Sequence, residues 1–239
     1  MKVLLRLVFV LAAILLTAWP APADPGEGLA VHLPFNGDAE DVSGRGNHGL
    51  VDLAAPAKDR CGREDMAMQF WNVDNGLVKI EGADMPEMRR KMSISAWIFP
   101  TKSDGDHVIV ERFDPKTSRD FRLSTHDGFL RFWWSKTGST EGRTDFDFFS
   151  SRKELVRNCW HHVVVSFSYG RVNMYIDGKC DTTTMSMTGS IFTGKAPVSI
   201  GGGLFQDEHC FDGRIDDVRI YERFLSGSEV KQLFEAGCD

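Results

Sequence analysis

Oxygen-bearing side chains are concentrated in a glycine-rich stretch between Phe35 and Gly49. Its carboxylate, amide and hydroxyl groups come from Asn36, Asp38, Glu40, Asp41, Ser43 and Asn47. Ca²⁺ is bound by six to eight oxygens of these kinds, and the four glycines of the stretch would let the backbone fold around an ion. The alternative is that Asp41 and Asn47 form Asx turns, in which the side chain binds nearby backbone.

Two further carboxylates, Asp216 and Asp217, lie in a strand-like run near the end of the chain. Strict alternation would place Asp216 on the same face as Val218 and Ile220, and so toward the apolar side. A carboxylate there is costly unless it is paired, hydrogen-bonded or metal-bound. We therefore predict that Asp216 meets Asp41 at a calcium site. The full predicted ligand set is Asn36, Asp38, Asp41, Asn47, Asp216 and Asp217.

Adjacent tryptophans at positions 133 and 134 suggest a second kind of site. Neighbouring residues on a strand point to opposite faces, so Trp133 shares a face with Phe129 and Arg131. Leu130, Phe132 and Trp134 share the other face, which is wholly apolar and is the better candidate for the core. Arg131 and Trp133 are then candidate ligand contacts. The alternative is that Trp133 is partly buried under a loop.

A β-hairpin is predicted between Cys159 and Cys180, with Tyr169-Gly170 as its two-residue loop. In this register Phe167 faces Val172, and the flanking apolar residues also pair on one face. Cys159 then faces Cys180 at a site where Cα atoms lie about 4.5 Å apart, which a disulfide can span. We predict this bridge. Among Cys61, Cys210 and Cys238, the sequence allows one more bridge and one free thiol without choosing the pair.

Other short runs rich in apolar residues recur between Gly, Asp, Asn and Pro, a pattern typical of an all-β sandwich or barrel. We expect strands at 29–35, 66–71, 77–80, 92–99, 107–113, 121–124, 129–135, 146–150, 198–201 and 214–221. One short C-terminal helix is predicted from the capping box Ser226-Gly227-Ser228-Glu229 and an apolar stripe that includes Val230 and Leu233.

The first 23 residues have the organisation of a secretory signal peptide. Lys2 and Arg6 precede an apolar run, and Ala21-Pro22-Ala23 matches an A-x-A cleavage site. The apolar run is shorter than the roughly 20 residues of a membrane span. We therefore expect a secreted or periplasmic protein with one domain over 24–239 and no membrane span in the mature chain. The net charge of −6 argues against a nucleic-acid partner.

Four segments resemble the laminin-G-like, concanavalin A-like jelly-roll family. They are L-P-F-N-G-D-A-E-D-V-S-G-R-G-N-H-G at 33–49, M-S-I-S-A-W-I-F-P at 92–100, C-W-H-H-V-V-V-S-F with M-Y-I-D-G-K within 159–179, and F-D-G-R-I-D-D-V-R-I-Y-E-R-F-L-S at 211–226. The resemblance implies two packed antiparallel sheets, often with one calcium ion at the sandwich edge. It leaves function open, because the fold hosts lectins, adhesion modules and glucanases.

Glucanases of this kind carry E-x-D-x-E or E-x-D-x-x-E on one strand, which places two acids on one face as nucleophile and acid/base. That pattern is absent from the sequence. The nearest match is Asp145 and Asp147, which lack a glutamate partner, and His161-His162 has no accompanying nucleophile motif. We therefore expect a secreted, non-catalytic module that binds a glycan, with or without the help of calcium. A protein-binding or adhesion module is the alternative, and a glucanase-like hydrolase is third.

Overall fold

The protein was analysed as a computed structural model. It describes residues 26–72, 75–81, 88–114, 116, 118–139, 146–187, 189–204 and 210–237. The predicted signal peptide therefore lies outside the described residues. Within the described part of the chain, no helix has the length and apolar character needed to cross a membrane.

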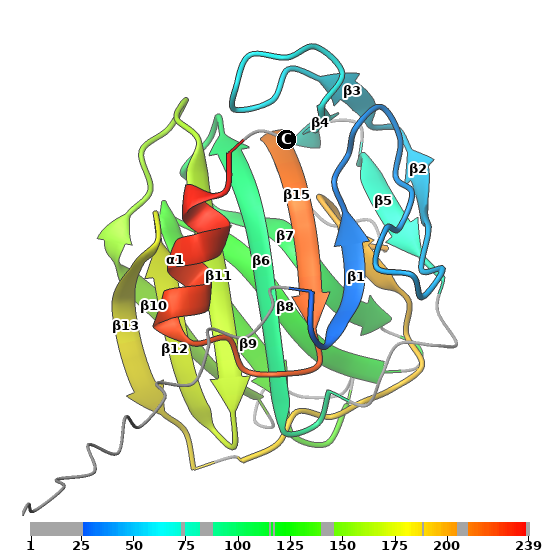
Figure 1. Ribbon diagram of the computed structural model, residues 1–239. Helices are drawn as coiled ribbons and strands as arrows, with labels where there is room; N and C mark the ends of the chain where they lie inside the picture. Colours follow the sequence, from blue (N-terminus) through cyan, green and yellow to red (C-terminus); the bar gives the residue numbers. More distant parts are fainter. Residues whose placement is uncertain are drawn as a thin grey trace, which may run out of the picture.

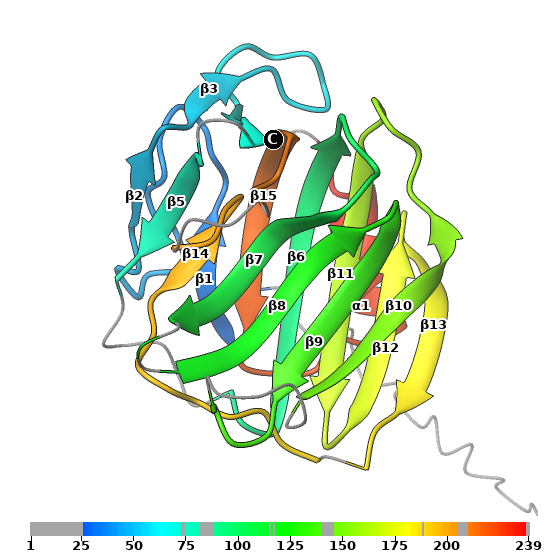
Figure 2. The same ribbon diagram turned by 180° about the vertical axis from the view of Figure 1, so that it is seen from behind.

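Two antiparallel sheets pack face to face, as predicted (Figures 1 and 2). The first sheet runs in the order β13-β12-β11-β6-β15-β4-β3, with β1 also paired to β15. Its strands are β1 (Leu29–Leu33), β3 (Ala55–Ala57), β4 (Ala67–Phe70), β6 (Lys91–Pro100), β11 (His161–Ser168), β12 (Arg171–Ile176), β13 (Lys179–Met185) and β15 (Gly213–Tyr221). The first and last strands of the described chain are thus neighbours, as the jelly-roll expectation requires.

The second sheet runs in the order β10-β9-β8-β7-β14-β5-β2 and faces the viewer in Figure 2. Its strands are β2 (Gly49–Asp52), β5 (Leu77–Ile80), β7 (Asp106–Asp114), β8 (Ser118–His126), β9 (Phe129–Ser135), β10 (Phe146–Glu154) and β14 (Val198–Ile200). Strands β2, β3 and β13 were not predicted. They are short or polar and lie at or near sheet edges, where one apolar face is not required.

The main core lies between the two sheets and follows from period-2 alternation. Ile94 and Val165 of the first sheet, and Leu123 and Phe132 of the second, are fully buried in one cluster. Burying one such side chain stabilises the fold by about 1.5–3 kcal/mol relative to leaving it in water.

Helix α1 (Gly227–Glu235) covers the outer face of the first sheet (Figure 1). The predicted capping box is confirmed: Ser226 accepts the backbone N–H of Glu229, and the Glu229 side chain accepts the backbone N–H of Ser226. Val230 and Leu233 pack in a second cluster with Val164 and Tyr221. An apolar stripe on a short helix thus closes one outer face of the sandwich.

The hairpin of β11 and β12 has the predicted register, with Val163 opposite Ile176 and Phe167 opposite Val172. The predicted disulfide is wrong, because Cys159 and Cys180 are both exposed free thiols. Strand β12 ends at Ile176, and Asp177 and Gly178 turn the chain with φ of 53° and 72°. Cys180 therefore lies on β13 opposite Tyr175. Of the remaining cysteines, Cys61 is disulfide-bonded, Cys210 is buried, and Cys238 lies outside the described residues.

Candidate functional site

The outer face of the second sheet carries the predicted aromatic site. Strand β9 alternates as expected: Leu130, Phe132 and Trp134 are buried in the core, while Arg131 and Trp133 are half-buried on the opposite face. No described helix lies over this face, in contrast to the face under α1 (Figure 2). Both predicted ligand contacts therefore lie on the outer face of the second sheet.

Strand β10 adds aromatic side chains beside Trp133. The register pairs Trp133 with Phe148, which is 53% exposed, and Arg131 with Ser150. The Trp133 ring lies 6.0 Å from the Phe146 ring, and the Arg131 guanidinium lies 5.2 Å from the Phe148 ring centre. We call Arg131, Trp133, Phe146, Phe148 and Ser150 the Trp133 face. It combines flat apolar rings with a guanidinium and a hydroxyl.

A buried ionic network on strands β7 and β8 supports this face. Arg122 lies opposite Trp133, with its guanidinium 5.4 Å from the indole ring centre. Its Nε donates to Glu111 Oε2 at 2.7 Å, and its Nη1 donates to Asp106 Oδ2 at 3.0 Å. Burial by itself would lower the pKa of Arg122, but the two carboxylates outweigh burial and raise it. Arg122 is therefore held charged and fixed beside the indole, on the neighbouring strand.

The sequence search for paired carboxylates missed Asp106 and Glu111. Strand β7 contains a bulge between Val108 and Val110, so residues five apart reach the same guanidinium. A period-2 pattern cannot detect such a pair. Glu111 is fully buried and bound to Arg122, which fits a structural ion pair better than an acid/base pair.

Asp147, which belongs to the pair closest to a glucanase motif, also binds neighbouring side chains. Asp147 is hydrogen-bonded to Ser186 and lies 3.4 Å from the Lys136 ammonium. Its suggested partner, Asp145, lies outside the described residues. His161 Nδ1 contacts both oxygens of Asp177 at 3.2 Å, while His162 Nε2 is 2.9 Å from Ser95 Oγ. Ser95 and His162 are both buried, so their contact joins β6 to β11 and is not exposed to a substrate.

The predicted calcium ligands near the start of the chain are bonded to protein donors. Asp41 Oδ1 accepts the backbone N–H groups of His32 and Ser43, and Oδ2 accepts the Ser43 hydroxyl and the Asn47 N–H, all at 2.8–3.0 Å. Burial would raise the pKa of Asp41, but these bonds outweigh burial and lower it. Asp38 accepts the Glu40 N–H, and Asn36 is exposed. The Asx-turn alternative therefore describes Asp41, whereas the Asn47 side chain donates to Ala30 O at 2.9 Å.

Asp216 does not face the core, so that expectation is wrong. A bulge between Asp216 and Arg219, with Asp217 at φ 50°, restarts the alternation and leaves Ile215 and Val218 pointing inward. The carboxylate instead accepts Arg60 Nη1 at 2.6 Å. Burial raises the pKa of Asp216 to about 7, even though the Arg60 charge opposes this shift.

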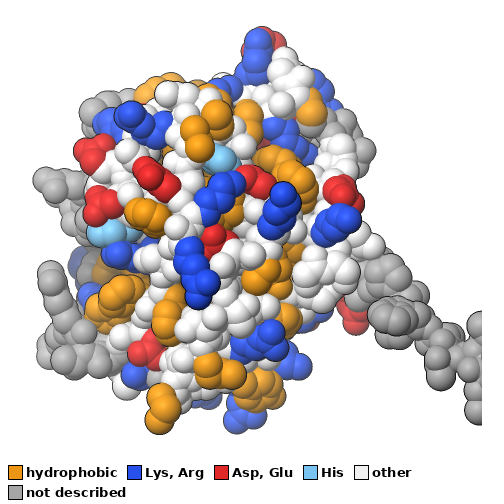
Figure 3. Space-filling model, turned by 90° about the vertical axis from the view of Figure 1, so that its left-hand side faces the viewer, with side chains coloured by type: hydrophobic (Ala, Val, Ile, Leu, Met, Phe, Trp, Pro, Cys, Tyr) orange, Lys and Arg blue, Asp and Glu red, His pale blue; other side chains and the backbone are white. Residues whose placement is uncertain are grey.

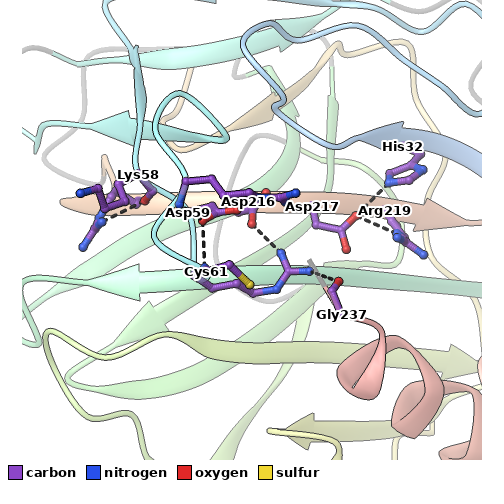
Figure 4. Close-up of polar contacts among 11 residues, drawn as sticks. His32, Lys58, Asp59, Cys61, Asp216, Asp217, Arg219 and Gly237 are labelled. Atoms are coloured by element: carbon purple, nitrogen blue, oxygen red, sulfur yellow. Dashed lines mark hydrogen bonds and ion pairs between the residues drawn. The ribbon is translucent and has the colours of Figure 1, made fainter. Parts of the chain in front are cut away.

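Asp217 points away from Asp216, toward His32 and Arg219 (Figure 4). Its Oδ1 lies 2.8 Å from His32 Nε2 and 2.9 Å from Arg219 Nε. Burial acts to raise the pKa of Asp217, but the bonds from these two partners outweigh burial and lower it well below its usual range. Asp216 and Asp217 thus each pair with an arginine, Arg60 and Arg219, on the outer face of the first sheet.

As arranged, these side chains do not fit a calcium ion. Protein donors already bind the carboxylates of Asp41, Asp216 and Asp217. Within the described ranges, no group of three or more His, Cys, Asp or Glu side chains could hold a metal. We derive no function from calcium, and the ion stays a prediction from the sequence.

A family model described as "Concanavalin A-like lectin/glucanases superfamily" (Laminin_G_3) matches residues 73–231, more than half of the chain. A curated relative, adhesion G-protein coupled receptor V1 of Danio rerio, is 23% identical over 153 residues. That match covers 62% of this chain and only 2% of the receptor.

Solved structures share the fold at low identity. The binding domain of Paraclostridial Mosquitocidal Protein 1 gives a TM-score of 0.71 at 17% identity, covering 88% of this chain and 52% of that one. A second structure is Domain 4 of AbnA, a GH43 extracellular arabinanase from Geobacillus stearothermophilus, in complex with arabinotriose. Its TM-score is 0.65 at 22% identity, and the match covers 87% of this chain and 98% of that one. The botulinum neurotoxin serotype D binding domain gives a TM-score of 0.65 at 16% identity, covering 88% of this chain and 52% of that one. The chain thus spans about half the length of the toxin structures.

Proposed function

Because the chain belongs to the concanavalin A-like lectin/glucanase superfamily, we propose that it is an exported, non-catalytic module that binds carbohydrate at the Trp133 face. The observation that carries the proposal is the half-buried indole of Trp133 beside an exposed Phe148, on a sheet face that no described helix covers. Aromatic rings with a few fixed polar groups are the usual components of a ligand site.

The composition of the face favours a saccharide over a protein partner. Arg131 and Ser150 interrupt the rings, so the surface is not one broad apolar patch of the kind that protein docking uses. Two of the structural relatives also support binding: the arabinanase domain is in complex with arabinotriose, and the mosquitocidal-protein structure is that of a binding domain. The signal-peptide pattern at 1–23 supports export.

The test is binding of neutral arabino-, xylo-, gluco- and galacto-oligosaccharides, measured by calorimetry for the wild type and two tryptophan variants. We expect Trp133→Ala to weaken binding at least tenfold, equivalent to about 1.4 kcal/mol. Trp71→Ala is the matched control, because Trp71 is 39% exposed beyond β4 of the other sheet. Unchanged binding by Trp133→Ala, or release of reducing sugar by the wild type, would contradict the proposal.

A further inference from the structure

Cationic side chains gather at one end of the first sheet, where β6 and β12 begin and β11 and β15 finish. The members are Arg89, Arg90, Lys91, Arg171 and Arg223, and we call this group the basic end. It is the lower end of the molecule in Figures 1 and 3, and in Figure 3 blue Lys and Arg side chains lie beside orange hydrophobic ones there. The chain as a whole carries a net charge of −6, so the cluster is a local feature.

The backbone fixes the positions of these side chains. The backbone carbonyl of Arg90 accepts the Tyr169 N–H at 2.8 Å, and that of Arg89 accepts the Ile191 N–H at 2.7 Å. Lys91 lies opposite Ser168 in the β6–β11 ladder, and Ser168 lies opposite Arg171 in the β11–β12 ladder. The backbone pairing therefore brings the starting points of these side chains together at one end of the sheet.

Among the described residues, most of these cations have no anionic partner. Arg223 is paired with Glu229, and Glu222 at the same end is paired with Arg45 at 2.8 Å. Arg89, Arg90, Lys91 and Arg171 form no ion pair with any carboxylate in the described part of the chain. Four like charges held near one another create a positive potential that attracts an anionic ligand.

An exposed aromatic ring stands among these charges. Tyr169 is 54% exposed, with Arg90 and Lys91 lying 5.7 and 5.9 Å from its ring centre. It occupies the first position of the hairpin loop at φ 48°, where Asn, Asp or Gly is usual and a bulky residue costs roughly 1–2 kcal/mol. A strained residue that presents its ring to solvent points to a role in binding.

One hollow adjoins this ring, and a second lies beside the first. One of about 610 Å³ is lined by Arg89, Arg90, Lys91, Tyr169, Ser190 and Glu222. The other, of about 340 Å³, is lined by Lys91, Ser168, Arg171, Arg223 and Phe224. Lys91 lines both, and each is large enough for one or more sugar rings.

We propose that the basic end binds an acidic saccharide, with a sugar ring on Tyr169 and its sulfate or carboxylate groups on Arg89, Arg90, Lys91 and Arg171. The arginine fork matches the geometry of both anions. The ring favours a saccharide, because a bare phosphate or lipid headgroup has no flat face to place on it. This site is separate from the Trp133 face and does not depend on it.

The experiment measures binding of dextran sulfate and polygalacturonate, with neutral dextran as the control, to the full exported chain. We expect the wild type to bind both acidic polymers and not neutral dextran, with affinity falling as salt rises. Arg89→Gln combined with Arg90→Gln should weaken binding at least tenfold. Lys102→Gln with Lys231→Gln is the matched control, because both lysines are exposed and paired elsewhere.

Tyr169→Asn separates binding from folding. Asn suits a left-handed turn, so this variant should be at least as stable as the wild type and still lose binding. Trp133→Ala should keep acidic-polymer binding, which distinguishes failure of this inference from failure of the proposed function. Equal binding of neutral dextran, unchanged binding by Tyr169→Asn, or equally strong binding of anionic lipid vesicles or single-stranded DNA would overturn it.

Discussion

One carboxylate, that of Asp41, joins two separate parts of the chain. It accepts the His32 N–H from β1 and two donors from Ser43, together with the Asn47 N–H of the following loop. Asn47 in turn donates its side-chain amide to Ala30 O at 2.9 Å. At the scale of single residues, this stretch works as a hydrogen-bonded clasp that holds the loop against the first strand.

We predict that Asp41→Asn lowers the free energy of unfolding by about 1–3 kcal/mol, because an amide nitrogen would replace one of the two acceptor oxygens. Asp38→Asn is the control, since Asp38 is exposed and, within the described residues, accepts only the Glu40 N–H; it should cost less than about 0.5 kcal/mol. Urea unfolding measures both. Equal stability of the two variants would contradict the clasp.

The same clasp has a pH signature. The folded pKa of Asp41 is depressed, so its stabilisation is present above the unfolded pKa and is lost as pH falls through the folded value. The difference in the free energy of unfolding between wild type and Asp41→Asn should therefore become smaller below about pH 4. EDTA should leave the wild-type melting temperature unchanged. If calcium instead raises the melting temperature of the wild type but not that of Asp41→Asn, the predicted calcium site is supported and the clasp interpretation is contradicted.

At the scale of elements, the turn between β12 and β13 also positions helix α1. Gly178 has φ 72°, and a Cβ there would lie 2.8 Å from the Phe234 ring. Phe234 stacks on Trp97 of β6 with ring centres 5.6 Å apart. The turn that moves Cys180 off the hairpin thus lies directly against the helix that closes the first sheet.

We predict that Gly178→Ala destabilises the protein more than Gly105→Ala does. Both glycines have positive φ, 72° and 81°, but a Cβ at Gly105 meets nothing within 4 Å. Gly105→Ala, the control, should lower the free energy of unfolding by about 1–2 kcal/mol through the backbone alone. Gly178→Ala should lower it more, because Phe234 must also move. Thermal unfolding measures both, and Phe234→Ala should reduce the difference. Equal costs would show that the turn and helix are not coupled.

Local sequence signals predicted the elements well but not their irregularities. The β11–β12 register and the α1 capping box follow from alternation and short-range chemistry, and both are confirmed. The Asp177-Gly178 turn had a visible signal, since Asp-Gly is a strong hairpin dipeptide, but the cysteine pairing favoured a longer hairpin. The bulges in β7 and at Asp217 had no such signal, and each changed which carboxylates share a face.

At the scale of the whole molecule, the two outer faces of the sandwich differ. Helix α1 closes the first, while the second carries Trp133 and Phe148 without a described helix over it (Figures 1 and 2). The order of strands could not be derived from composition, because β6 pairs with β11 and β15 across long sequence separations. The placement of Arg131 and Trp133 on the outer face could be predicted because the alternation along β9 is regular.

The central claim is that saccharide binds over Trp133. Its most direct test is a titration of ¹⁵N-labelled protein with the oligosaccharide that binds best in the neutral panel, followed through the tryptophan indole N–H resonances. We expect the Trp133 resonance, assigned with Trp133→Phe, to shift with saturation, while that of fully buried Trp134 moves little. A shift confined to Trp71 or Trp160, with Trp133 unmoved, would contradict the account.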